Sequence, residues 1–164
     1  MQVDVREIIN VPGERRFFDY EPSPEGLETG AVAALLPGWR AFGVIENRAG
    51  VLHLEGTLEA AVTYECSRCL KAVDKTLTIP MHAVLVERES TEEPDAFLIV
   101  GGMVDVDEIV CDAFILNADD RFLCSEDCKG LCSRCGADLN EGPCGCEKEI
   151  DPRLAVLRQL LETD

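Results

Sequence analysis

The stretch that decides the fold is residues 51–86, which read VLHLEGTLEAAVTYECSRCLKAVDKTLTIPMHAVLV. Apolar side chains alternate with polar ones over 52–64, and the same period of two returns over 77–85. Such alternation is typical of β-strands with one buried face. Because the two runs flank a Cys-x-x-Cys turn, the sequence predicts a long β-hairpin with Cys66 and Cys69 at its tip.

Four residues within these runs need an explanation. At about 3.3 Å per residue, straight arms of this length would reach roughly 50 Å. We therefore expect Gly56 and Pro80 to be bends or bulges, with Pro80 at a sheet edge because proline cannot donate to a ladder. His53 and His82 fall on the polar faces of the runs, so we expect them to face solvent rather than bind a metal.

Two helices are predicted after the hairpin. In DVDEIVCDAFILNA (105–118) apolar residues recur at helical spacing, and Asp105 and Asp107 suit a helix N-terminus. A second helix is expected in DPRLAVLRQLLE (151–162), where Pro152 fits the first turn and the leucines form one stripe.

The predicted fold class is α+β: an antiparallel β-sheet or partly closed barrel with a long hairpin, two helices and a C-terminal zinc-knuckle segment. Segments 2–8 and 39–46 are expected to add strands to the sheet. The 164 residues, 46% of them hydrophobic, suffice for one sizeable core. We expect a β-rich core with one helix over 1–118. The cysteine-rich zinc-binding segment and C-terminal helix, over 119–164, should pack on the same domain.

Nine cysteines carry the candidate chemistry, and six of them lie in the polar stretch CSEDCKGLCSRCGADLNEGPCGC (124–146). No signal-peptide pattern and no transmembrane run are found, so we expect a cytoplasmic protein without membrane contact. In a reducing compartment, close-spaced cysteines bind metal more often than they form disulfides. Structural zinc contributes about 10–16 kcal/mol to the folding of such segments, so we expect two structural zinc ions.

Two groupings of the cysteines remain open. In the first, one ion lies within the C-terminal segment and the other joins that segment to the hairpin tip. The two sets are Cys132, Cys135, Cys144 and Cys146, and Cys66, Cys69, Cys124 and Cys128. In the second, the four cysteines of 124–135 share one ion and the remaining two pairs share the other. Cys111 is predicted to be a small core residue. Iron–sulfur ligation by the same thiolates is a further alternative.

The charge balance bears on the partner. With 32 acidic and 15 basic residues the formal charge is -17, which repels phosphate backbones and favours a basic protein partner. The alternative is direct RNA contact through cations near the cysteines, namely Arg68, Lys71, Lys129 and Arg134. A cysteine redox sensor is a third reading. No phosphate loop, nucleophile elbow or His-Glu-x-x-His motif is found, so we expect neither an enzyme nor a small-molecule substrate.

The chain resembles the YceD family over about residues 50–161. The resemblance rests on CSRCL (66–70), VDVDEIVCDAFILNA (104–118), the stretch 124–146 and DPRLAVLRQLL (151–161). Members are described as large ribosomal RNA subunit accumulation proteins. The resemblance implies a role in the accumulation or maturation of that RNA in bacteria, with a large-subunit ribosomal protein or assembly factor as partner. Some members keep only the hairpin pair and a later counterpart, which favours the first grouping. Similar members carry Leu-Pro-x-x-Pro-Leu where this chain reads LNADDRFL (116–123).

Overall fold

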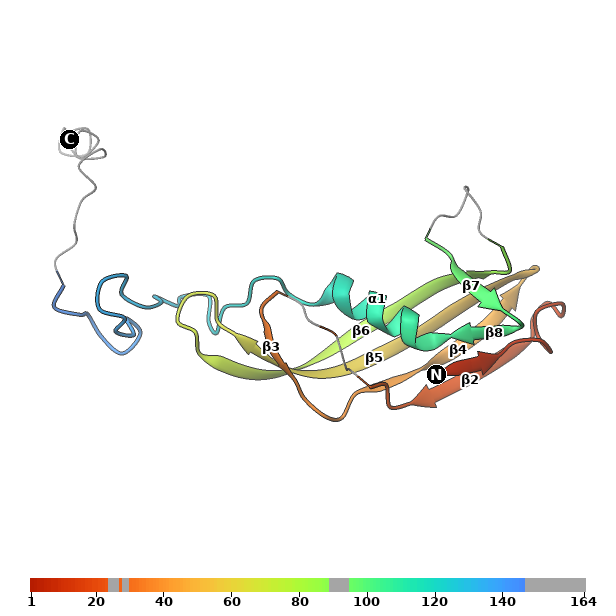
Figure 1. Ribbon diagram of the computed structural model, residues 1–164, viewed down its shortest axis with the longest axis horizontal. Helices are drawn as coiled ribbons and strands as arrows, with labels where there is room; N and C mark the ends of the chain where they lie inside the picture. The colour runs from red at the N-terminus through yellow and green to blue at the C-terminus, as the bar shows by residue number, and fades with distance from the viewer. Residues whose placement is uncertain (24–26, 28–29, 89–94, 147–164) are drawn as a thin grey trace, which may run out of the picture.

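An eight-stranded sheet dominates the computed structural model, which describes residues 1–23, 27, 30–88 and 95–146 (Figure 1). The strands follow the spatial order β1-β8-β7-β6-β5-β4-β2, and β3 pairs with β5. The elements are β1 Gln2–Asp4, β2 Arg15–Tyr20, β3 Val32–Leu35, β4 Arg40–Arg48, β5 Val51–Glu65, β6 Ala72–Val86, β7 Phe97–Val100, β8 Met103–Asp105 and α1 Val106–Asn117. The segments 2–8 and 39–46 do contribute strands, as predicted.

The predicted long hairpin is confirmed as β5 and β6. Its register runs without a shift from Leu52 opposite Leu85 to Glu65 opposite Ala72. The alternating apolar side chains of β5 are buried along its whole length, because one face of the hairpin covers the core. The Cys-x-x-Cys turn therefore lies at the far end of a continuous two-stranded ladder.

No bulge occurs at Gly56 or Pro80, although the sequence predicted a bend or bulge there. Gly56 lies opposite Gly43 of β4 in an unbroken ladder. A Cβ on Gly43 would come within 2.6 Å of the Gly56 Cα and 2.9 Å of the Phe18 ring, so the glycines make room for that ring. Pro80 does lie at an edge, because the far side of β6 pairs with β7 only at the last two residues of β6.

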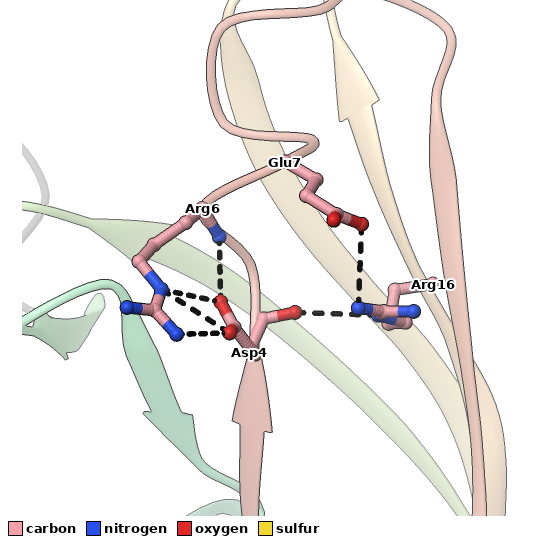
Figure 2. Close-up of polar contacts among 4 residues, drawn as sticks. All are labelled: Asp4, Arg6, Glu7 and Arg16. Atoms are coloured by element: carbon pink, nitrogen blue, oxygen red, sulfur yellow. Dashed lines mark hydrogen bonds and ion pairs between the residues drawn. The ribbon is translucent and has the colours of Figure 1, made fainter.

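The two end strands of the sheet, β1 and β2, are linked by side chains (Figure 2). Arg16 of β2 donates from Nε to the Asp4 carbonyl oxygen at 3.3 Å and forms an ion pair with Glu7 at 3.6 Å. Arg6 folds back onto the Asp4 carboxylate, and this side-chain hydrogen bond lowers the pKa of Asp4 to about 2. The sheet is therefore a nearly closed barrel, in agreement with the predicted fold class.

Helix α1 begins where the end strands meet. Asp105 caps it by accepting a hydrogen bond from the Asp107 N–H at 3.1 Å, as the sequence predicted for a helix N-terminus. Asp107 also accepts from the Tyr20 hydroxyl of β2 at 2.8 Å and forms an ion pair with the amino group of Met1. The start of α1 thus binds both ends of the sheet. At the other end of the helix, Leu116 is 82% exposed, although its spacing places it on the apolar stripe.

One helix, not two, is present among the described residues. The helix predicted for residues 151–162 lies outside the described residues, so the predicted number of two helices is not reached. Helix α1 packs on the core, where the Phe114 and Trp39 rings lie 4.7 Å apart. In the part of the chain that the structure describes, no helix is long and apolar enough to cross a membrane. The division at residues 118 and 119 stays a prediction.

Candidate metal centres

The hairpin tip forms a tight turn, the first knuckle (residues 66–71). The Cys66 N–H donates to the Lys71 carbonyl at 3.0 Å, and the Leu70 N–H donates to the Cys66 carbonyl at 2.9 Å. Leu70 takes a φ of 59°, a left-handed conformation that costs a residue with a side chain about 1–2 kcal/mol. The turn therefore holds Leu70 in an unfavourable backbone conformation.

The second CSRC forms the same turn, the second knuckle (residues 132–137). The Cys132 N–H donates to the Ala137 carbonyl at 2.8 Å, and the Gly136 N–H donates to the Cys132 carbonyl at 2.9 Å. Gly136 takes a φ of 72°, which a glycine adopts without steric cost. The two knuckles thus have equivalent hydrogen bonds, and each has a residue in the left-handed conformation at the same position. Only in the second knuckle is that residue a glycine.

The first site joins the hairpin tip to the C-terminal segment. Its four cysteines are Cys66, Cys69, Cys124 and Cys128, and their Sγ atoms all lie within 4.8 Å of one another. The Cys66 and Cys128 sulfurs are 3.8 Å apart, and those of Cys69 and Cys124 are 3.5 Å apart. All but Cys124 are buried, so the site is a small core of its own beyond the barrel.

Backbone contacts fasten the C-terminal segment to the first knuckle. The Ser67 N–H donates to the Phe122 carbonyl at 2.8 Å, and the Leu131 N–H donates to the Arg68 carbonyl at 3.0 Å. Gly130 permits this approach, because a Cβ there would lie 2.9 Å from the Arg68 carbonyl oxygen. Arg68 also donates from Nη1 to the Cys128 carbonyl at 2.7 Å. Residues far apart in the chain therefore meet in a fixed register.

The stretch LNADDRFL, where family members similar to this chain carry Leu-Pro-x-x-Pro-Leu, also takes part in this docking. The Phe122 ring stacks on the Tyr64 ring at 4.8 Å, and the Asp119 N–H donates to the Tyr64 hydroxyl at 3.1 Å. Lys75 lies over both rings. This stretch thus leads the chain from α1 to the first site along the hairpin.

The second site is local and more exposed. Its cysteines are Cys132, Cys135, Cys144 and Cys146, with all Sγ atoms again within 4.8 Å of one another. Cys135 is exposed and the other three are half-buried. The structure thus gathers the sulfurs as in the first of the two groupings that the sequence left open. The second grouping is not the one that the structure brings together.

Asn140 connects the two sites, although it lies in the loop of the second. Its Nδ2 donates to the Cys128 sulfur of the first site at 3.5 Å, while its Oδ1 accepts from the Lys129 N–H at 2.8 Å. The adjacent Leu139 N–H donates to the Gly130 carbonyl at 2.9 Å. Asn140 was not among the residues predicted from the sequence, because cysteine spacing contains no signal for a residue that supports a ligand.

The spacing of the sulfurs fits a single tetrahedral ion. With metal–sulfur bonds of about 2.3 Å, the sulfurs of such a site lie about 3.8 Å apart. The first site contains separations of 3.8 and 3.5 Å, and no sulfur pair in either site exceeds 4.8 Å. A cluster with several irons distributes its thiolates over different metal atoms and holds them farther apart. The nine cysteines are also free rather than disulfide-bonded.

The first cysteine of each knuckle is prepared for ionisation. Burial raises the pKa of Cys66, but hydrogen bonds from backbone N–H groups, that of Cys124 first, outweigh it and lower the pKa to about 6. The backbone N–H groups of Cys135 and Arg134 lower the pKa of Cys132 to about 6. Each site therefore contains one thiol that readily becomes the thiolate a metal requires.

Other thiols in the sites hold their protons more tightly. Hydrogen bonds shared with the Cys69 and Cys128 sulfurs raise the pKa of Cys124 to about 12. The Cys135 sulfur raises the pKa of Cys146 to about 12 in the same way. Four thiolates this close repel one another, so a cation is needed to ionise the whole set.

The remaining candidates fall outside the two sites. Cys111 is half-buried against the core, and burial raises its thiol pKa. His82 is exposed and His53 half-buried, and neither is near a sulfur set. Among the RNA-contact candidates, Arg68 is committed to the Cys128 carbonyl. The others, Lys71, Lys129 and Arg134, are exposed.

Comparisons with known proteins place these features in context. A family model described as "Large ribosomal RNA subunit accumulation protein YceD" matches residues 54–161. An uncharacterised protein of Mycobacterium bovis is 32% identical over 172 aligned positions, covering 98% of this chain and 81% of the relative. Two plant proteins are named "Large ribosomal RNA subunit accumulation protein YCED homolog 1, chloroplastic". The one from Arabidopsis thaliana is 24% identical, covering 60% of this chain and 40% of the relative. The one from Zea mays is 25% identical, covering 70% and 50%. No solved structure matches the chain.

Proposed function

The chain belongs to the YceD family, and from this premise we propose that it is a non-enzymatic, zinc-binding factor that supports the accumulation of large-subunit ribosomal RNA during ribosome assembly. Its partner is a basic protein, either a ribosomal protein of the large subunit or an assembly factor. The observation that carries the proposal is the presence of two four-sulfur sites in a chain of this family.

The chemistry of the sites supports a structural role for the metal. Four thiolates saturate a tetrahedral zinc ion, whereas a catalytic zinc keeps a position open for water or substrate. Three ligands of the first site are buried, which further shields the ion. Zinc there holds the hairpin tip and the C-terminal segment together, so the metal shapes a surface rather than a reaction centre.

The charge supports a basic protein as the direct partner. The chain has a formal charge of -17, and each filled site adds four thiolates and one dication. Two filled sites therefore bring the charge to about -21. Such a field attracts cationic proteins and opposes contact with phosphate backbones. The effect on RNA accumulation is then indirect.

Affinity capture tests the proposal. The tagged protein is captured from its own cells with and without ribonuclease, and bound proteins are identified by mass spectrometry. Retention of large-subunit proteins or assembly factors after nuclease is the expected result, and their complete release would contradict it. The double variant Cys66→Ser/Cys69→Ser should lose these partners. Cys111→Ser, which changes a cysteine outside both sites, should keep them.

Direct RNA binding is the second candidate function. It is favoured by exposed cations on the knuckles, with Lys71 on the first and Arg134 on the second. An RNA complex would weaken by roughly one log unit per log unit of salt for each phosphate engaged. If the purified protein binds large-subunit RNA with such a slope, and Lys71→Gln or Arg134→Gln abolishes that binding, direct RNA binding replaces the first proposal.

Redox sensing is the third candidate, favoured by the exposed Cys135 of the second site. Mild oxidation should then release zinc and change partner binding together. If oxidised protein keeps its metal and its partners, this candidate fails.

A further inference from the structure

A groove lies at the edge of the sheet, away from the metal centres. It has a volume of about 1370 Å³ and is bordered by α1, the edge of β6 and the β7–β8 hairpin. Figure 1 places β7 and β8 at the end of the long hairpin opposite to the tip that carries the first knuckle. We call it the edge groove. None of its lining residues belongs to a cysteine site.

Large apolar side chains are exposed in the edge groove. Leu116 of α1 is 82% exposed and Val100 of β7 is 73% exposed. Leu98 of β7 is 37% exposed, and Phe97 and Met103 also line the groove. Single exposed apolar residues are ordinary, but several that line one concave surface mark a binding site. Covering Leu116 would remove a largely exposed leucine side chain from water, which favours binding.

Apart from His82, the ionisable side chains of the edge groove are all acidic. Its lining includes the carboxylates of Asp95, Asp105, Glu108 and Asp112, and neither lysine nor arginine. Glu108 and Asp112 stand four residues apart on α1, so the two carboxylates lie on the same side of the helix and repel each other. Neither has a salt-bridge partner among the described residues. A cationic occupant would neutralise this pair.

The edge of β6 in the groove limits the form of the occupant. Between Ala72 and Val84, β6 pairs only with β5, so its second edge is open in the described ladders. Pro80 lies in the middle of this edge and lines the groove, and it has no N–H to offer to an added strand. Recognition by side chains is therefore favoured over extension of the sheet.

We propose that the edge groove binds a basic amphipathic segment of a protein, with the apolar residues of the segment on Leu116 and Val100 and its lysines or arginines on Glu108 and Asp112. This inference rests on the proposed function, because it assigns a place to the basic protein partner. The edge groove and the zinc-held hairpin tip then lie at opposite ends of the long hairpin and make two separate contacts with the partner.

Peptide binding to the zinc-loaded protein of 164 residues tests the inference. The probe is a fluorescent synthetic peptide in which leucines form one helical face and lysines the other. A peptide with serine in place of leucine has the same charge and is the matched control. We expect the leucine–lysine peptide to bind more tightly, and Leu116→Ser to weaken it by roughly tenfold. Glu108→Gln with Asp112→Asn should weaken it by roughly fivefold at low salt.

Matched substitutions outside the groove separate specific binding from bulk charge. Phe17 of β2 is 74% exposed and lies outside the groove, so Phe17→Ser should leave peptide affinity unchanged. Glu14→Gln with Glu21→Gln also removes two negative charges, but at surface positions outside the groove. This variant should leave the peptide affinity unchanged as well. Equal losses in groove and control variants would overturn the inference. Thermal unfolding of each variant establishes that it is folded.

Two other occupants would also overturn the inference. If Leu157→Ser with Leu161→Ser raises peptide affinity, the C-terminal segment of the chain itself occupies the groove. If the protein sediments as a dimer and Leu116→Ser makes it a monomer, the groove joins two copies.

The capture experiment keeps the two proposals distinguishable. If Leu116→Ser loses the peptide but retains the nuclease-resistant partners, the groove is not their binding surface, and the proposed function stands. If the parent protein captures no nuclease-resistant protein, the proposed function fails, whereas the peptide measurement still decides the groove.

Discussion

The two knuckles have the same four residues and the same hydrogen bonds, yet they have different consequences for the molecule. Both cysteines of the first knuckle are buried, and their partner sulfurs lie 55 and 62 residues away in the chain. The second is exposed, and all its partners lie between residues 132 and 146. An ion in the first site closes a long loop and fixes the C-terminal segment on the hairpin, whereas one in the second orders only a local loop. The consequence of a metal site thus depends on how much chain its ligands enclose.

Removing each knuckle separately is the strongest test of this difference. Cys66→Ser/Cys69→Ser and Cys132→Ser/Cys135→Ser should each reduce two zinc ions per chain to one, as measured by elemental analysis. Only the first should also release the C-terminal segment to proteolysis, because the zinc contribution of about 10–16 kcal/mol then no longer holds that segment. The second should leave the melting temperature of the barrel unchanged. One zinc in the parent protein, or iron in place of zinc, would refute the two-site assignment, and Cys111→Ser serves as the control.

Acidification should affect both sites alike. In the folded protein the pKa values of Cys66 and Cys132 are lowered to about 6. Ionisation of these two thiols therefore stabilises the folded state fully above the unfolded pKa of about 8.5. This stabilisation is lost as the pH falls through 6. The raised pKa values of Cys124 and Cys146 mean that zinc displaces at least one proton per site at pH 7.

Zinc affinity should therefore fall by roughly tenfold or more per pH unit below pH 8, and more steeply below 6. Competition with a chromogenic chelator across this range measures the slope for each single-site variant. A slope near zero at either site would contradict the assigned protonation states.

Asn140 offers a test of whether the two sites are coupled. Asn140→Ala removes the N–H donor to the Cys128 sulfur and should weaken zinc binding at the first site by roughly tenfold, although the residue belongs to the second loop. Chelator competition on otherwise unchanged protein, followed through the separate release of the two ions, measures the first site while the second loop stays folded. Asn117→Ala, which removes an exposed amide at the end of α1, should leave that affinity unchanged. An unchanged affinity in Asn140→Ala would show that the sites act independently.

A reciprocal exchange at the left-handed position should give the smallest effects. Leu70→Gly relieves the strained φ at the cost of a more flexible unfolded chain, so we expect a gain of about 0.5–1 kcal/mol in the free energy of unfolding. Gly136→Leu should cost the second knuckle about 1–2 kcal/mol, because nothing lies within 4 Å of the added Cβ and only the backbone is strained. Denaturant unfolding measures the effect of Leu70→Gly. The zinc affinity of the second site measures the effect of Gly136→Leu. Effects of the same sign would refute the shared geometry of the knuckles.

Periodicity and short motifs determined much of this fold. The alternation on either side of the first CSRC predicted β5, β6 and the turn between them, and the acidic start of 105–118 predicted the cap of α1. The short strands β2, β3, β7 and β8 were not assigned from sequence, because strands of three to six residues depend on their neighbours in the sheet. The Gly101–Gly102 turn, with φ of 62° and 77°, is a local signal that would have indicated the β7–β8 hairpin.

Sequence alone determined which cysteines could bind metal, since a Cys-x-x-Cys turn is a local structure fixed by a few backbone hydrogen bonds. Which sulfurs share a site was decided only by the tertiary structure. That choice depends on the Phe122 carbonyl, the Arg68 side chain and the narrow space at Gly130, which bring segments more than fifty residues apart into one register. Local spacing cannot encode such contacts, because they arise from the path that the sheet and α1 impose on the chain between them.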